Sequence, residues 1–306
     1  MDLVVVAPRL PSLGETVYGD SFSMFPGGKG ANQALAASKL GSTVAMVGRI
    51  GDDAFGRQLL ASLSGAGVNT SSIIVEHEAP TGTALIEVDS TGENRIIVVA
   101  GANAHLSPDD IDATAASWGE ARILMLQQEI PQETVLYAAR KAKEKGLTVI
   151  LDPAPARPLA PELAQLVDII TPNEHEAEIL LGQPVGEPKE ALAAVSRLRQ
   201  LGFPVAIIKL GANGAVVAWD QGCKWVKGYA VTAIDTTAAG DAFAGGLATA
   251  LARGQDVLEA LSFANATGAL STTRPGAQTS MPTRKEVEAF FEQHGGIPHA
   301  ASRTTR

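Results

Sequence analysis

From about Ile123 onward, short apolar runs alternate with helical segments, and this alternation constrains the fold more than any other feature. Ile123 to Leu126 precedes a predicted helix over Gln132 to Lys145, Leu147 to Leu151 follows it, and Val205 to Lys209 is a later apolar run. Strands that alternate with helices form a parallel sheet with both faces covered. We therefore predict an α/β core whose mostly parallel sheet lies between helical layers.

The N-terminal part of the chain has a different pattern. Thr83 to Val88 and Arg95 to Ala100 are apolar or alternating runs joined across Asp89 to Asn94, which predicts a β-hairpin. Leu3 to Ala7 and Glu15 to Phe25 are further extended stretches. Because these strands are not interleaved with helices, we expect a small second sheet beside the core.

Charge and cysteine content limit the classes of function. The chain has 306 residues and a formal net charge of −9, and it offers no basic stripe, so we expect no nucleic-acid partner. Cys223 is the single cysteine, which excludes an internal disulfide and favours a reducing cytoplasm. No apolar run is long enough to span a bilayer and no signal peptide is evident, so we expect a cytoplasmic protein without a membrane partner.

The most informative motif is Asp235-Thr236-Thr237-Ala238-Ala239-Gly240-Asp241, which an apolar helical run from Ala242 to Leu251 follows. Small residues before a helix let backbone N–H groups approach a ligand, and a helix N-terminus attracts anions. Asp241 falls in the first helical turn, where a carboxylate beside a phosphate is repulsive unless it takes a proton. This is typical of a general base beside an anion hole, as phosphoryl transfer to a hydroxyl requires. From this stretch alone, an acid that complements the helix dipole explains Asp241 equally well.

A second motif, Pro26-Gly27-Gly28-Lys29-Gly30-Ala31-Asn32-Gln33, opens an alanine-rich helix that we expect to end near Gly41. Lys29 in the first turn faces the positive end of the helix dipole, which is unfavourable. We infer that an anion or a ligand hydroxyl compensates it. The spacing is not that of a phosphate-binding P-loop.

Two further polar groups follow predicted strands. Glu129 comes after Ile123 to Leu126, where the carboxyl ends of parallel strands gather ligands, although a helix-capping or exposed acid fits equally well. Asn173 is a good helix N-cap, and acids in a first turn stabilise any helix. That explanation is sufficient for Glu174 and Glu178, so a metal-linked role for Asn173 and Glu176 requires other support.

Taken together, these motifs resemble those of the PfkB-type carbohydrate kinases. Gly27 to Asn32 and Asp235 to Asp241 correspond to the two family signatures. Three more segments narrow the resemblance to the ribokinase branch: Asp152 to Ala156, Pro172 to Glu178 and Gly276 to Ser280. The resemblance extends from Asp2 to about Phe291, and the two signatures in this order are highly specific.

The resemblance implies a three-layer α/β/α core over residues 26–80 and 101–294 and a β-sheet lid over residues 1–25 and 81–100. Residues 295–306 are then a tail, which we expect to be disordered because Ile297 is its only large apolar residue. The implied reaction is ATP-dependent phosphorylation of D-ribose at O5, with Mg²⁺ and a monovalent cation, usually K⁺. An exposed lid sheet suggests a homodimer through the lids.

The resemblance also assigns individual residues. Asp241 accepts the O5 proton, and the amides of Ala238, Ala239 and Gly240 hold the migrating phosphoryl charge; Ala238 replaces the glycine most common there. The sugar-binding positions are Asp2, Gly28, Lys29, Asn32, Glu129 and Asp241. The nucleotide-binding positions are Asn173, Lys209, Leu210, Gly211, Ala212, Asn213, Gly214, Gly240 and Asn265. Asn173 and Glu176 organise Mg²⁺ and the phosphates through water. The K⁺ positions are Asp235, Thr237, Ser271, Arg274, Gly276 and Ser280.

One departure from the family concerns the start of the sequence. The family usually opens with an apolar core strand that ends in a turn of the form N-x-D, and a lid strand comes next. Here Asp2 to Pro11 aligns with the family segment after that turn, so the resemblance makes Leu3 to Ala7 a lid strand, whereas the residues alone favour a core strand. The family's first core strand and its sugar-binding asparagine have no counterpart here. We therefore expect a start codon upstream of Met1.

Other functions remain open at this stage. A related kinase for deoxyribose, another pentose or a nucleoside would carry the same motifs. A non-catalytic sugar-binding protein is a third possibility, which the intact Lys29 and Asp241 disfavour. A dinucleotide-binding fold is weaker, because no G-x-G-x-x-G follows a strand.

Overall fold

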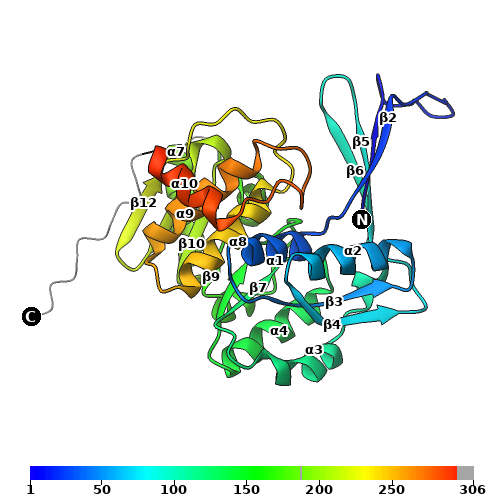
Figure 1. Ribbon diagram of the computed structural model, residues 1–306. Coiled ribbons are helices and arrows are strands. Elements are labelled where there is room, and N and C mark those ends of the chain that lie inside the picture. The colour runs from blue at the N-terminus through cyan, green and yellow to red at the C-terminus, as the bar shows by residue number, and fades with distance from the viewer. Residues whose placement is uncertain (187, 295–306) are drawn as a thin grey trace, which may run out of the picture.

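The structure, a computed structural model, describes residues 1–186 and 188–294 (Figure 1). The predicted tail over residues 295–306 lies outside the described residues. The core sheet has the strand order β12-β11-β10-β9-β8-β7. The strands are β7 (Ile123–Leu126), β8 (Thr148–Leu151), β9 (Ile169–Ile170), β10 (Val205–Lys209), β11 (Ala215–Trp219) and β12 (Gly222–Val226). Neighbours from β7 to β10 are parallel, and β11 and β12 are antiparallel additions, which confirms a mostly parallel sheet.

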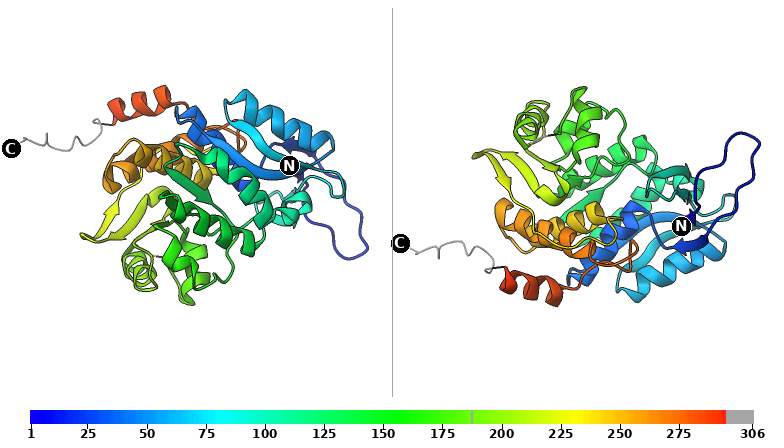
Figure 2. Two further views of the ribbon diagram at one scale, coloured as in Figure 1. Left: turned by 90° about the horizontal axis from the view of Figure 1, so that it is seen from below. Right: turned by 90° about the horizontal axis from the view of Figure 1, so that it is seen from above.

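Helices cover both faces of this sheet, as the alternation predicts (Figure 1, Figure 2). Because successive strand residues point to opposite faces, Ile208 joins one apolar cluster and Ile207 the other. The first cluster packs against α3 (Pro108–Ala115), α4 (Gln132–Glu144) and α7 (Pro188–Gln200). The second packs against α8 (Ala239–Ala252), α9 (Val257–Ser271) and α10 (Arg284–Gln293). The remaining helices are α1 (Lys29–Lys39), α2 (Ala54–Gly65), α5 (Leu163–Leu166) and α6 (Glu174–Leu181), with short 3₁₀ turns at Gly101–His105, Ala116–Trp118 and Gly211–Asn213.

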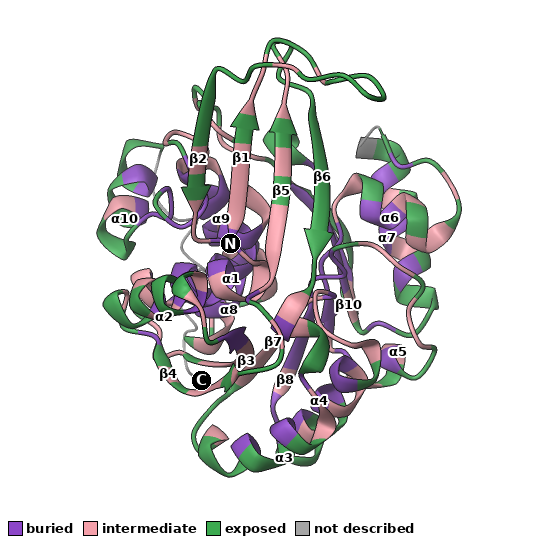
Figure 3. Cartoon of the chain, turned by 90° about the vertical axis from the view of Figure 1, so that its right-hand side faces the viewer, coloured by how far each residue is buried: buried purple, intermediate pink, exposed green. Residues whose placement is uncertain are grey.

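A separate four-stranded sheet stands beside the core with the order β2-β1-β5-β6 (Figure 3). Its strands are β1 (Asp2–Val6), β2 (Ser21–Phe25), β5 (Thr83–Val88) and β6 (Asn94–Val99). β5 and β6 form the predicted antiparallel hairpin. β1 pairs with β2 and β5, so the N-terminal run lies in the small sheet, as the resemblance implied. The extended stretch expected over Glu15 to Phe25 was too long for a strand: only Ser21–Phe25 is a strand.

Two more strands, β3 (Ala45–Gly51) and β4 (Asn69–Glu76), pair in parallel as a sheet of their own. β7 is the edge strand of the core sheet and pairs with β8. The exposure of the two strands differs accordingly: Leu124 and Met125 are only partly buried, whereas Val149 and Ile150 are completely buried. The core sheet and the β3–β4 pair therefore both present strand edges without a ladder partner among the described residues.

Close packing between α1 and α8 brings the two signature motifs together. α8 is buried over most of its length. A Cβ on Gly245 would lie 2.7 Å from the Cβ of Ala36, so glycine permits the two helix backbones to approach. The first turns of both helices, which carry Lys29 and Asp241, consequently open at the same edge of the core sheet.

Candidate active site

Functional side chains converge at the carboxyl ends of the core strands. Glu129 follows β7, Asp152 follows β8, Asn173 follows β9 and Lys209 ends β10. The N-termini of α1 and α8 open at this edge, and the base of the small four-stranded sheet adjoins it (Figure 1). In open α/β sheets this is the edge where ligands bind. The structure therefore brings the predicted sugar, nucleotide and base residues into one site.

Asp241 is the buried centre of this site, with 5% of its surface exposed. Its Oδ2 accepts a hydrogen bond from Asn32 Nδ2 at 2.9 Å, and its Oδ1 accepts one from Gln33 Nε2 at 3.0 Å. Burial raises the pKa of Asp241, and the positive charge of Lys29 opposes part of that rise. A buried carboxylate whose pKa is raised and whose oxygens are held by two amide donors is positioned to accept a proton.

Lys29 supplies the positive charge that these carboxylates require. Burial alone would lower its pKa, but the negative charges around it outweigh burial and the pKa of Lys29 is raised. Those charges are Asp241, Asp152, Glu129 and Glu176. Carboxylates of the chain itself therefore lie near enough to Lys29 to offset its unfavourable position in the first turn.

Glu129 does not cap the helix after Pro131, α4, which has no side-chain cap, but contacts the start of α1 instead. Its Oε2 accepts a hydrogen bond from the backbone N–H of Lys29 at 2.9 Å, so it caps the N-terminus of α1. It is also partly buried in the site, and burial raises its pKa. Asp2 lies nearby against the glycine loop, since a Cβ on Gly27 would be 2.2 Å from its Oδ2. Burial likewise raises the pKa of Asp2.

The loop before α8 has the backbone geometry of an anion-binding turn. Ala238 adopts the left-handed conformation, with φ 60° and ψ 14°. This turns the chain so that α8 starts at Ala239 and its first-turn N–H groups face the site. The Ala239 N–H donates to the carbonyl of Thr236 at 3.2 Å. The N–H groups of Gly240 and Asp241 belong to the first turn of α8, where backbone N–H groups have no acceptor within the helix. A Cβ on Gly240 would lie 3.5 Å from Lys209 Nζ, so a cation adjoins this turn.

Asn173 and Glu176 cap α6 reciprocally. Asn173 Oδ1 accepts from the N–H of Glu176 at 2.8 Å, and Glu176 Oε2 accepts from the N–H of Asn173 at 2.7 Å. The N-cap prediction for Asn173 is therefore confirmed, and Glu176 completes a capping box that was not predicted. Asn173 also forms an isolated β-bridge with Lys209, which places this cap beside the carboxyl ends of β9 and β10. Structural capping and a location in the site coexist here.

A family model described as pfkB family carbohydrate kinase matches residues 1–284. The chain belongs to this family. Ribokinase from Haemophilus influenzae is 42% identical over 291 residues, which cover 95% of each chain. The structure of Thermotoga maritima ribokinase aligns with a TM-score of 0.86 at 40% identity, over 95% of this chain and 96% of that one. Arabidopsis thaliana ribokinase complexed with ribose and ATP aligns with a TM-score of 0.86 at 35% identity, over 94% of each chain.

The relatives include another sugar kinase. A protein named deoxyribokinase from Salmonella typhimurium is 37% identical over 293 residues, covering 95% of each chain. The family and the three-layer fold with a small separate sheet are thus confirmed for this carbohydrate kinase. Which sugar a related kinase prefers depends on the residues that line its sugar-binding site.

The carboxylate of Glu176 is a suitable group to hold, through water, a Mg²⁺ ion that is bound to phosphate. No group of three or more His, Cys, Asp or Glu residues within residues 1–186 and 188–294 has the arrangement of a metal site. Mg²⁺ in kinases commonly takes one or two carboxylates, waters and phosphate oxygens, which requires no such group. Glu176 is buried at the site and its carboxylate is available for a water-mediated contact.

The residues assigned to K⁺ form a polar junction beside the turn that precedes α8. Asp235 accepts from the N–H of Thr237 and from the N–H of Gly276, each at 2.8 Å, and so joins the two segments. Ser271 and Ser280 are buried and each donates its hydroxyl to a nearby carbonyl. These oxygens suit a hard cation. The Arg274 side chain pairs with Glu286, so only its backbone carbonyl is compatible with such a site.

The predicted nucleotide segment contributes mostly backbone. Leu210 is buried, and Gly211–Asn213 form a 3₁₀ turn that ends at Gly214 with φ 90°. Asn265 Nδ2 donates to the carbonyls of Val226 and Lys227, so this side chain orders the chain after β12.

Sequence reasoning did not single out Gln33 and Asp152 as site residues. Both belong to motifs that we recognised, yet their side chains had no assigned role. Gln33 is 1% exposed and Asp152 is 2% exposed. The only signal in the sequence was a polar residue within an otherwise apolar helix or at the end of an apolar strand. Once buried, such a residue requires a hydrogen-bond partner.

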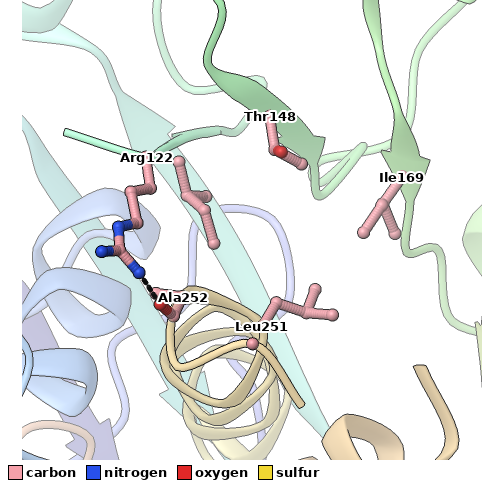
Figure 4. Close-up of a pocket in the computed structure, with 7 residues that line it drawn as sticks. Arg122, Thr148, Ile169, Leu251 and Ala252 are labelled. Carbon is pink, nitrogen blue, oxygen red and sulfur yellow. Dashed lines mark hydrogen bonds between the residues drawn. The ribbon is translucent and has the colours of Figure 1, made fainter. Parts of the chain in front are cut away.

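A cavity of about 290 Å³ lies at the opposite edge of the sheet (Figure 4). Arg122, Ile123, Thr148 and Ile169 line it at the amino ends of β7, β8 and β9, together with the end of α8. Arg122 closes one side by donating to the carbonyl of Ala252 at 2.9 Å. None of the predicted site residues lines this cavity. Within the described residues, no helix is long and apolar enough to cross a membrane.

Proposed function

We propose that this carbohydrate kinase transfers the γ-phosphoryl group of ATP to O5 of D-ribose, giving ribose 5-phosphate and ADP. The observation that carries the proposal is the buried Asp241 carboxylate in the first turn of α8, beside a left-handed turn that presents backbone amides. The ribokinases at 42% and 43% identity, and the ribokinase structure with ribose and ATP, support the choice of substrates.

The proposed chemistry is a direct displacement. Asp241 accepts the O5 proton as the oxygen forms its bond to the γ-phosphorus, and the bond from that phosphorus to the bridging oxygen breaks to release ADP. The amides of the turn over Ala238, Ala239 and Gly240 stabilise negative charge on the transferred group. Within that turn the Gly240 amide is the better donor, because Ala239 already donates to Thr236.

Binding positions follow from the same geometry. The sugar would lie between the lid and α1, in contact with Asp2, Gly28, Lys29, Asn32 and Glu129. ATP would lie over the carboxyl ends of β9 and β10, along Asn173, Asn265 and the backbone of Lys209 to Gly214.

Two cations complete the proposal. Mg²⁺ on the ATP phosphates would be held through water by Glu176, where it neutralises phosphate charge. K⁺ would be held at Asp235, Thr237, Ser271, Arg274, Gly276 and Ser280, which fixes the loop that ends in the anion-binding turn. Replacing K⁺ by tetramethylammonium at constant ionic strength is expected to lower activity at saturating Mg²⁺. Equal rates in the two salts would remove K⁺ from the mechanism.

We also propose that residues 1–25 and 81–100 act as a lid and that two lids pair in a homodimer. Exposed apolar side chains of Phe22, Met24, Leu85 and Ile97 share one face of this sheet by the strand register. Contiguous exposed apolar surface favours association. Sedimentation analysis that finds only monomers at micromolar concentration would contradict this pairing. The single cysteine, Cys223, is consistent with a cytoplasmic enzyme.

The substrate is tested by measuring ADP release from purified protein with ribose, deoxyribose, other pentoses and nucleosides. The highest kcat/KM is expected for ribose, and the product should be identified as the 5-phosphate by NMR. A higher kcat/KM for deoxyribose would favour the function of the Salmonella relative. Sugar binding without ADP release would indicate a non-catalytic protein.

A further inference from the structure

Gln33 is the buried polar residue whose contacts the proposed chemistry does not use. Its Nε2 donates to Asp152 Oδ2 at 2.9 Å and to Asp241 Oδ1 at 3.0 Å. Its Oε1 accepts from Gln127 Nε2 at 2.6 Å, which fixes the direction of the amide. One side-chain amide therefore directs both of its hydrogens at two carboxylates that would otherwise repel each other.

Asp152 is in turn neutralised by a lysine. Lys209 Nζ donates to Asp152 Oδ1 at 2.8 Å, and both side chains are buried. The contacts form a continuous chain from Lys209 through Asp152 and Gln33 to Asp241. Buried charges that are hydrogen-bonded and paired in this way hold one geometry.

We propose that the Lys209–Asp152–Gln33 chain is a positioning unit for Asp241, which fixes the orientation of its carboxylate and the pH range in which it can accept a proton. The inference rests on the proposed role of Asp241 as the general base. Gln33 holds the carboxylate through Oδ1, and Asn32 holds the other oxygen at 2.9 Å. Because each of its oxygens accepts from a different amide, the Asp241 carboxylate cannot rotate freely relative to the turn before α8.

All charged groups near Asp241 enter this balance. Lys29 from α1 and Lys209 from β10 are the cations, and Asp152, Glu129, Glu176 and Asp2 are the anions near them. The charge of Asp152 raises the pKa of Asp241, whereas the hydrogen bonds from Asn32 and Gln33 lower it. The Asp152 charge and the Gln33 hydrogen bond therefore shift the pKa of Asp241 in opposite directions. Replacing Asp152 and replacing Gln33 should consequently have opposite effects on this pKa.

The first substitution is Gln33→Met, which keeps the volume and removes both hydrogen bonds. Asp241 then loses a donor and faces Asp152 directly, so the acid limb of the kcat/KM profile should move to higher pH by about one unit. The loss of activity from this shift should approach about tenfold on the acid limb and disappear at alkaline pH.

The second substitution is Asp152→Asn, which removes the negative charge and keeps one acceptor oxygen, for either the Gln33 or the Lys209 hydrogen bond. The acid limb should move to lower pH. Gln128→Met is the matched control, because Gln128 is also a buried glutamine at the same strand end but accepts from Arg157 rather than donating to a carboxylate. Its acid limb should stay in place. The titration of ATP is common to all four proteins and cancels in the comparison.

Opposite shifts in the Gln33→Met and Asp152→Asn variants would support the positioning unit. A loss of kcat that is equal at every pH, or shifts of the same sign, would overturn it. Circular dichroism and thermal melts identify variants that fail to fold, and in that event Gln33→Glu serves instead. This variant adds a carboxylate beside Asp241 and should also move the acid limb to higher pH. If Asp241→Asn keeps its activity, the proposed base itself is wrong; if it is inactive while the shifts are absent, only the positioning unit is wrong.

Discussion

Asp241 is held where a carboxylate is least stable, and this conflict separates a catalytic role from a helix-dipole role. A residue that only complements the dipole needs no burial and no hydrogen bonds from two other side chains. Asp241→Asn should therefore leave sugar binding intact and lower kcat by about 10²- to 10⁴-fold, the usual effect of removing a general base. Steady-state kinetics on ribose and ATP measure this, with calorimetry for ribose affinity. A decrease of less than about tenfold would indicate a dipole residue.

The same substitution makes a prediction for stability. The pKa of Asp241 is raised in the folded protein, so the folded state holds this proton more tightly than the unfolded chain, whose aspartate pKa is about 3.9. As pH rises above that value, the native protein loses stability relative to Asp241→Asn. Thermal melts should show little difference near pH 4 and a higher Tm for the variant at pH 8. A lower Tm for the variant at pH 8 would show that the carboxylate stabilises the fold.

Ala238 is the one non-glycine residue with positive φ among the described residues. An alanine in this conformation costs about 1–2 kcal/mol, and a β-branched residue is still less favourable. Ala238→Gly removes this strain but adds freedom to the unfolded chain, so activity and Tm should stay close to those of the native protein. Ala238→Val should lower both, because the turn that presents the anion-binding amides is disturbed. Equal Tm and kcat for the two variants would argue that the turn tolerates other conformations.

At the scale of elements, the α1–α8 contact sets the geometry of the site. A Cβ on Gly245 would overlap Ala36, so Gly245→Ala should push α1 away from α8. Overpacking of this kind typically costs about 1–3 kcal/mol, more than alanine gains over glycine in a helix. Because α1 carries Lys29, Asn32 and Gln33, kcat should fall with the Tm. Gly65→Ala is the control: this α2 glycine has open space around its Cβ position, so Tm and kcat should be maintained or slightly improved.

The elements also show what sequence patterns can specify. Val205–Lys209 was predicted with the observed bounds, and the helix over Gln132 to Lys145 was correct to within one residue. Strand direction was beyond prediction: β11, with the apolar sequence AVVAW, resembles a parallel core strand but pairs antiparallel with β10. An apolar run indicates that a strand is buried on both faces of a sheet. Whether the strand runs parallel or antiparallel to its neighbour depends on how the chain connects the two strands.

The site was predictable to the extent that local motifs carry it. Lys29, Asn32 and Asp241 belong to motifs with their own local geometry, so their convergence could be inferred from the family resemblance. Gln33 and Asp152 are 119 positions apart and meet only through tertiary packing. A pairing of that kind leaves no periodic or spacing signal, which is why the positioning unit emerged only from the structure.

At the scale of the whole molecule, three groups of strands meet near Met1. The Met1 amine donates to the carbonyl of Gly82 at 2.8 Å, and the adjacent Thr81 hydroxyl accepts from the N–H of Gly51 at the end of β3 at 3.0 Å. Glu129, which follows β7, is close enough to influence the pKa of this amine. Met1 thus lies near the carboxyl ends of both β3 and β7, each of which has an edge without a ladder partner among the described residues.

This arrangement predicts what residues placed before Met1 would do. A run of Val, Ile and Leu ending in Asn, joined to Met1, would reach it by running parallel to β7 and β3 and could form ladders with both. Each fully buried side chain would contribute about 1.5–3 kcal/mol, and the amine, whose pKa burial lowers, would become an uncharged amide. We expect a clear rise in Tm and hydrogen-exchange protection at Ile123 to Leu126. A Gly/Ser extension of equal length is the control, and an equal Tm for both extensions would show that these edges do not accept a strand.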